Sequence, residues 1–145
     1  METVWTIALT LVLVVVAVAI HYEVLRGTSL LIPHLSIRPR SRILVVIAGV
    51  LVAHLMQICV YAVAYFAMQG HFSLGSIAGE FHGTATDFFY FSLTSYTTLG
   101  IGDMFPRGPI RIVAGIEALN GFVLIGWSVS FTYLAMEKFW ELHRR

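Results

Sequence analysis

The sequence predicts an all-α membrane protein with three transmembrane helices and one shorter helix that enters the membrane without crossing it. Hydrophobic residues make up 58% of the 145 residues and charged residues only 12%, whereas globular domains carry about a quarter charged residues. Three apolar segments have the length of about 20 residues that a helix needs to cross a bilayer. A shorter helical segment, 85–96, leads directly into a glycine-rich run.

The three long apolar segments are 3–20, 43–68 and 112–136. The first two carry no charged residue, and the third carries one, Glu117. The mean hydropathy of the whole chain, +0.83, is also that of a protein with lipid as its solvent.

The first segment has an alternative interpretation as a signal peptide. Residues 17–19 read Ala-Val-Ala, which resembles a cleavage motif. However, the chain starts with the acidic Glu2 rather than with basic residues, and a signal peptide begins with a positive region. We therefore expect a retained transmembrane helix.

Basic residues predict the orientation, because they concentrate on the cytoplasmic side of membrane proteins. They follow the first span and the last span: Arg26, Arg38, Arg40, Arg42, Lys138, Arg144 and Arg145. We expect a multi-pass protein of the cell membrane with its N-terminus outside and its C-terminus in the cytoplasm, in contact with lipid.

The helix expected over 85–96 is too short to span a bilayer. Thr84 or Thr86 can cap its start, and Asp87 lies in its first turn, where a negative charge is favourable. Non-helical backbone at membrane depth is tolerated only where protein buries it or it lines a cavity. The glycine-rich run that follows is therefore expected at a cavity.

That run is residues 97–103, Thr-Thr-Leu-Gly-Ile-Gly-Asp. Alternating glycines let successive carbonyls point one way, and four such stretches around an axis form oxygen rings that replace the water around a cation. The run resembles the selectivity filter of the tetrameric potassium-channel family, commonly Thr-Val-Gly-Tyr-Gly-Asp. A glycine-rich turn of a soluble domain is the alternative, which the apolar flanking segments disfavour.

The resemblance covers 87 to about 136 and implies a pore helix, a filter and an inner helix in this order. It implies a homotetramer around a central pore, with K⁺ bound as the permeant ion and no other cofactor. The implied ion-binding residues are Thr98, Leu99, Gly100 and Ile101. The implied supporting residues are Thr97, Gly102, Asp103, Tyr90 and Glu117, with Gly121 as a candidate hinge.

Two departures from the family pattern affect the expected selectivity. Leu99 replaces the usual valine or isoleucine, and Ile101 replaces the usual tyrosine or phenylalanine. In the family that aromatic ring packs against the pore helices, and isoleucine is smaller. The family's pattern also implies a bond from Asp103 to an aromatic group of the pore helix, where Tyr90 can donate and Phe91 cannot.

Three polar residues inside the apolar segments are candidates for a functional role. Glu117 is expected to support the filter from behind, to modulate gating by protonation or to snorkel. Its expected partners are Arg111, Asn120 or a neighbouring subunit's pore helix. His54 and Gln57, one turn apart, are expected to form an interhelical hydrogen bond.

Other function classes find no support. There is no nucleophile–base pair, zinc-ligand spacing or phosphate-binding loop, so we do not expect an enzyme. A net charge of +1 gives no reason to expect a nucleic-acid partner. Cys59 is the single cysteine and cannot pair within the chain.

The sequence therefore predicts a potassium-type cation channel with passive single-file conduction of monovalent cations. The alternatives are a weakly selective K⁺/Na⁺ channel and a non-conducting membrane assembly subunit. The expected organisation is an extra N-terminal helix (1–25), a basic cytoplasmic connector (26–42), a pore domain (43–140) and a short tail (141–145). Within the pore domain we expect an outer helix (43–68), a pore helix (85–96), a filter (97–103) and an inner helix (109–137).

Overall fold

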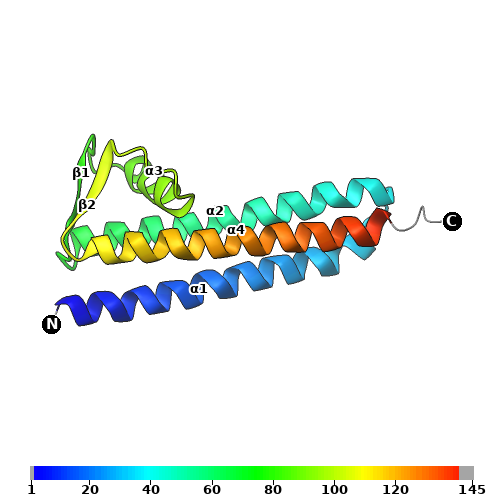
Figure 1. The fold of residues 1–145 in the computed structure, drawn as a ribbon, viewed down its shortest axis with the longest axis horizontal. Helices are drawn as coiled ribbons and strands as arrows, with labels where there is room; N and C mark the ends of the chain where they lie inside the picture. Colours follow the sequence, from blue (N-terminus) through cyan, green and yellow to red (C-terminus); the bar gives the residue numbers. More distant parts are fainter. Residues whose placement is uncertain (1, 141–145) are drawn as a thin grey trace.

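The computed structural model describes residues 2–140, and three long helices run side by side through it (Figure 1). These are α1 (Glu2–Leu31), α2 (Arg42–Gly70) and α4 (Ile110–Trp140). Each contains a segment long and apolar enough to cross a membrane, so the predicted all-α membrane fold with three such helices is confirmed. The short tail predicted over 141–145, with Arg144 and Arg145, lies outside the described residues.

The helix α1 extends further than the sequence predicted. The expected connector begins at residue 26, but the helix continues to Leu31, and short 3-10 turns then lead to α2. Arg26 forms an ion pair with Glu23 at 3.0 Å, one turn earlier in the same helix. Thr28 packs so closely on Gly49 of α2 that a Cβ there would lie 2.2 Å from the Thr28 hydroxyl oxygen. This contact with α2 holds the last turns of α1 in helical form, despite the glycine at 27.

A small antiparallel sheet that the sequence did not predict covers one end of the bundle (Figure 1). The strand β1 (Ser76–Gly79) pairs with β2 (Met104–Arg107), with Ser76 opposite Arg107 and Gly79 opposite Met104. A Cβ on Gly79 would lie 2.0 Å from the Asp103 carbonyl oxygen, so the pairing requires glycine there. The sheet therefore ties the loop before α3 to the segment after the glycine-rich run.

The short helix α3 (Ala85–Tyr96) lies at the same end and packs against α2 and α4. Its aromatic side chains fill this contact: Phe91 meets Tyr65 edge-on with ring centroids 5.0 Å apart. Phe88 meets Phe66 in the same way at 5.5 Å. The packing fixes the position of the C-terminal end of α3, where the glycine-rich run begins.

The helix α1 packs against α2 and α4. It begins at the end of the bundle that carries the sheet, and α4 ends at the opposite end (Figure 1). This places the first turns of α1 at the same end of the bundle as the loops around α3.

Candidate functional site

A capping box fixes the first turn of α3. The Thr84 hydroxyl accepts from the Asp87 backbone N–H at 3.2 Å, and the Asp87 carboxylate accepts from the Thr84 backbone N–H at 3.0 Å. The His82 backbone N–H also donates to this carboxylate, at 2.9 Å. The hydrogen bond from the Thr84 backbone, followed by that from His82, lowers the pKa of Asp87 below its ordinary value. The two groups satisfy donors that a helix start leaves unpaired.

Residues 97–103 continue directly from the last turn of α3. The Thr98 N–H donates to the Ser95 carbonyl at 3.0 Å, and the Gly100 N–H donates to the Thr94 carbonyl at 3.2 Å. These bonds anchor the first half of the run to the C-terminal end of α3. That end carries a partial negative charge of about half an elementary charge, which favours a cation nearby.

Every second residue of the run has a left-handed backbone. The angle φ is +58° at Thr98, +51° at Gly100 and +89° at Gly102. Glycine adopts such angles without strain, whereas threonine pays for them, and strained residues of this kind gather at functional sites. Positive φ at alternate residues is the backbone pattern that successive carbonyls need in order to point the same way.

The whole run is exposed in the single chain. Two large apolar side chains stand out, with Leu99 64% and Ile101 59% exposed. An oxygen ring around a cation needs several such runs facing one axis, and this chain supplies one.

The outer end of the run is held by the sheet and by α3. The Asp103 carbonyl accepts from the Glu80 N–H at 3.0 Å, and the Asp103 carboxylate accepts from the Met104 N–H at 2.9 Å. Asp103 also shares a side-chain hydrogen bond with Tyr90 of α3, which raises the pKa of Tyr90. Tyr90 is thus the aromatic group that meets Asp103, as the family pattern implies.

Glu117 lies behind α3 and is fully buried. Its carboxyl group accepts a hydrogen bond from Tyr65 of α2 and lies 2.6 Å from the Ser92 hydroxyl oxygen of α3. The expected partners Arg111 and Asn120 are wrong, and the pore helix it contacts is that of its own chain. The prediction that Glu117 snorkels is also wrong, because its side chain is 0% exposed and does not reach the surface of the bundle.

The contacts of Ser92 indicate where a proton lies. Its hydroxyl oxygen is 2.9 Å from the Ile58 carbonyl oxygen as well as 2.6 Å from Glu117 Oε1. One hydroxyl proton cannot serve both acceptors, whereas a protonated Glu117 would donate to Ser92 and free that proton for Ile58. The geometry therefore favours a neutral Glu117, which membrane depth also favours.

Gly121 lets α4 approach the end of α3. A Cβ at this position would lie 2.1 Å from the Tyr96 carbonyl oxygen. Of the two interpretations of Gly121, close packing has a direct structural reason, while α4 continues through this position without a break. A hinge at Gly121 stays a prediction.

The predicted interhelical hydrogen bonds of His54 and Gln57 are present, and both residues reach Tyr96. Sequence reasoning missed their partners, as it missed Tyr65 and Ser92. Each of these is a polar group inside or beside an apolar segment, and such groups seek partners because lipid offers none. That signal could have singled out His21 on α1, which also joins these contacts.

Among residues 2–140, no group of three or more His, Cys, Asp or Glu side chains is placed to hold a metal ion. A monovalent cation held by backbone carbonyls needs no such group. No curated protein and no solved structure matches the chain. A family model described as "Ion channel" matches residues 42–138. The match runs from the start of α2 into the last turns of α4 and covers more than half of the chain, so this protein belongs to that ion channel family and is a membrane channel rather than an enzyme.

Proposed function

We propose that the protein is a homotetrameric potassium-type cation channel that conducts passively and in single file. The observation that carries this proposal is the run 97–103. It follows a half-length helix, has positive φ at Thr98, Gly100 and Gly102, and is exposed in the single chain.

In the proposed mechanism, four copies of the run surround an axis. Thr98 contributes its hydroxyl and carbonyl oxygens to the innermost ion site, and Leu99, Gly100 and Ile101 contribute carbonyl oxygens to the sites above. These oxygens replace the hydration shell of K⁺, and ions pass because each site binds well enough to admit them and weakly enough to release them. The C-terminal ends of four α3 helices would favour a cation in the cavity below.

The support behind the run follows from its contacts. Thr97 donates its hydroxyl proton to the Leu93 carbonyl at 2.7 Å. Asp103 bonds to Tyr90, and Glu117 joins α3 to α2 and α4. In this proposal, these groups keep the run in a conducting geometry, and Gly102 completes its outer turn.

The orientation proposed is an outside N-terminus and filter mouth with a cytoplasmic C-terminus. The basic residues between α1 and α2 support it, because such loops are retained in the cytoplasm. The start of α1 and the end of α4, which lie at opposite ends of the bundle, agree with it (Figure 1).

Weak selectivity between K⁺ and Na⁺ is the second candidate, and Ile101 is the observation that favours it. Its side chain is 59% exposed and lacks the hydroxyl with which an aromatic residue could bond to the pore helices. A looser filter would discriminate less between two cations of different size.

Flux from purified protein in liposomes tests these proposals. We expect potassium to leave liposomes that contain the purified protein alone. If intact tetramers give no flux, the remaining interpretation is a non-conducting assembly subunit. Reversal potentials under K⁺/Na⁺ gradients then give the permeability ratio. A strongly K⁺-selective wild type would reject weak selectivity. A higher ratio in Ile101→Tyr would assign the looseness to this side chain.

A further inference from the structure

Five polar side chains from all four helices meet where α3 ends. They are His21 of α1, His54 and Gln57 of α2, Tyr96 of α3 and Ser128 of α4. His54 is partly buried and the other four are buried. Tyr96 is the residue immediately before the run 97–103, so this cluster lies at the inner end of the proposed filter.

The Ala17 carbonyl fixes the orientation of the Gln57 amide. Gln57 Nε2 lies 3.2 Å from that carbonyl oxygen, which can only accept. The amide oxygen Oε1 therefore faces Tyr96, and the Tyr96 hydroxyl must donate to it. Because Tyr96 has a single proton, it can only accept from its other partner, His54 Nδ1, at 2.7 Å.

The remaining protons follow in sequence. A neutral His54 with its proton on Nδ1 accepts at Nε2, so Ser128 donates to it at 2.9 Å. Ser128 then accepts from His21 Nε2 at 3.4 Å. His21 Nδ1 is left to accept from the second Gln57 amide proton, at 3.1 Å.

The result is a closed ring in which every member donates to the next. It runs from Gln57 to His21, Ser128, His54, Tyr96 and back to Gln57. The ring satisfies its polar groups only with both histidines neutral and in different tautomers. At membrane depth an unpaired polar group is costly, so a ring that satisfies all members favours one arrangement of the four helices.

We propose that this ring makes α1 a positioning element of the filter, holding Tyr96 and thus the inner end of the run while both histidines are neutral. This inference rests on the proposed function, because it assigns residues 97–103 to the filter. It gives α1, which lies outside the matched segment 42–138, a defined connection to conduction.

Adding a proton to the ring weakens it. A second proton on His21 would place an N–H opposite the Gln57 N–H, two donors facing each other. A second proton on His54 would force the Ser128 hydroxyl proton out of the ring. The rings of His21 and His54 face each other with centroids 5.3 Å apart, and the Trp127 ring packs on His21 with centroids 5.1 Å apart. Tyr61 of α2 and Glu117 of α4 also interact electrostatically with Tyr96.

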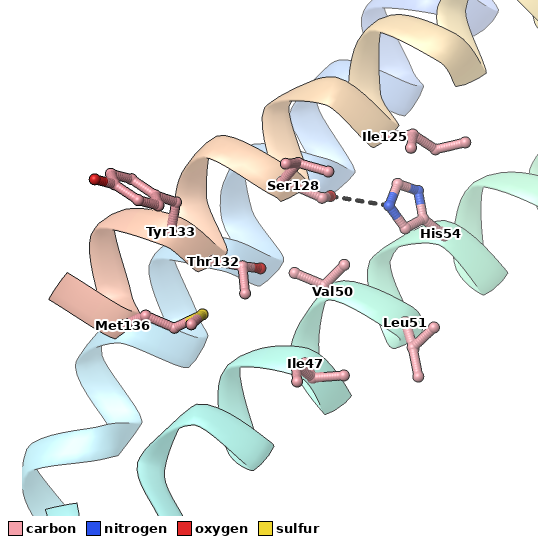
Figure 2. Close-up of a pocket in the computed structure, with 10 residues that line it drawn as sticks. Ile47, Val50, Leu51, His54, Ile125, Ser128, Thr132, Tyr133 and Met136 are labelled. Carbon is pink, nitrogen blue, oxygen red and sulfur yellow. Dashed lines mark hydrogen bonds between the residues drawn. The ribbon is translucent and has the colours of Figure 1, made fainter. Parts of the chain in front are cut away.

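A groove reaches two members of this cluster, His54 and Ser128, from one side. It has a volume of about 490 Å³ and lies between α2 and α4, with His54 and Ser128 at one end (Figure 2). Met136 and Ile47 lie toward its other end, away from the sheet. The groove leads along the two helices to the hydrogen bond between His54 and Ser128, so the ring is not sealed off by protein on that side.

The tautomers can be measured without any ion flux. Nitrogen-15 NMR of histidine-labelled protein in bilayers should show His21 protonated at Nε2 and His54 protonated at Nδ1 at neutral pH. His21→Gln and His54→Gln assign the two signals. A His54 signal protonated at Nε2 would overturn the ring, whether or not the protein conducts.

Flux measurements test the connection to the filter. His21→Leu and Tyr96→Phe should each change the K⁺/Na⁺ permeability ratio by about fivefold or more, as coupled sites commonly do. The double variant should be no worse than the more affected single variant, because both cut the same ring. Additive effects would show that the two residues act separately and would overturn the proposal.

Two matched controls separate the ring from general damage. Ser128→Ala should change the ratio, whereas Ser130→Ala should not, because Ser130 is exposed and its hydroxyl donates to the Gly126 carbonyl of its own helix, outside the ring. Acidification should alter the ratio in the wild type and in His71→Gln, but much less in His21→Leu. A wild type that conducts with an acid response unchanged by His21→Leu contradicts the inference, while a wild type without any flux contradicts the proposed function.

Discussion

Gly100 and Gly102 carry the backbone angles on which the proposed filter depends. Open space surrounds both positions, since an added Cβ would meet nothing within 4 Å in the single chain. A substitution there acts through φ, which is +51° at Gly100 and +89° at Gly102, and not through a clash. The distinction allows a test in which the fold is kept and the backbone of the run is changed.

We expect Gly100→Ala to abolish potassium flux in liposomes while leaving assembly intact. The strain of a left-handed non-glycine residue, about 1–2 kcal/mol per chain, would be relieved by rotating a carbonyl away from the axis. Gly126→Ala is the matched control, because it places a methyl group in open space on a regular helix and should conduct normally. Normal flux from Gly100→Ala would place the filter elsewhere.

Glu117 offers a second test at a single side chain. If it is neutral, as its contacts with Ser92 indicate, Glu117→Gln should keep the stability of the wild type, because an amide donates to Ser92 and accepts from Tyr65. Glu117→Ala should lose about 2–4 kcal/mol, since it leaves two buried hydroxyls without this partner and opens a cavity. Denaturation of the purified protein in detergent measures both.

Glu137→Ala is the control for this pair, because Glu137 is an exposed acid on the same helix and should have little effect. If Glu117→Gln proves as damaging as Glu117→Ala, the native group is an ionised carboxylate that the amide cannot replace.

For single side chains, the sequence predicted which polar residues need partners, but not the partners themselves. Glu117, His54 and Gln57 were recognisable as polar groups at membrane depth. Tyr65 and Ser92 were not, because which helix faces contact each other depends on the packing angle of the bundle. Tyr90 was predicted as the contact of Asp103 only through the family resemblance.

The helix α3 shows how a local sequence signal positions the run that we propose as the filter. Thr84 and Asp87 form both bonds of the capping box, so the start of the helix is set by residues three apart. The length of α3 then decides that the helix ends at Tyr96 and that the run 97–103 begins there. The cap is thus an element that can be weakened without touching the run.

We expect Asp87→Asn to lower the melting temperature at neutral pH and to abolish the part of the acid sensitivity that comes from the cap. The pKa of Asp87 is lowered in the folded protein, so its contribution is present above the unfolded pKa and is lost as the pH falls through the folded value. Melting curves of the wild type and Asp87→Asn should therefore converge in acid. Glu80 is an exposed acid in the preceding loop, so the melting temperature of Glu80→Gln should change with pH in the same way as that of the wild type.

The long helices could be predicted from sequence because hydropathy alone marks a segment that crosses a bilayer. The end of α1 could not be predicted. Gly27 suggests a break in the helix, and the residue whose contact with Thr28 keeps the helix intact, Gly49, lies on another helix. The sheet of β1 and β2 was missed for a similar reason. Glycine and proline near these strands read as loop signals, while their pairing joins residues far apart in the chain.

On the scale of the whole molecule, the single chain does not by itself surround the pore that we propose. Its three long helices and α3 form a packed bundle, but the run 97–103 lies on its surface rather than around an axis. Exposed apolar side chains also follow α4, among them Leu119, Phe122 and Val123. These side chains have two possible neighbours, lipid and further copies of the chain, and only the second would complete oxygen rings.

We therefore expect four chains in the conducting particle. Mass measurement of the purified protein in detergent should give a tetramer, because one run per chain and four runs per ring leave no smaller complete assembly. Phe122→Glu should shift the mass toward the monomer if this side chain packs between copies, while Val63→Glu, equally exposed on α2, should not if it faces lipid. A monomer that retains potassium flux in liposomes would contradict conduction through a shared filter, because one run cannot surround an ion.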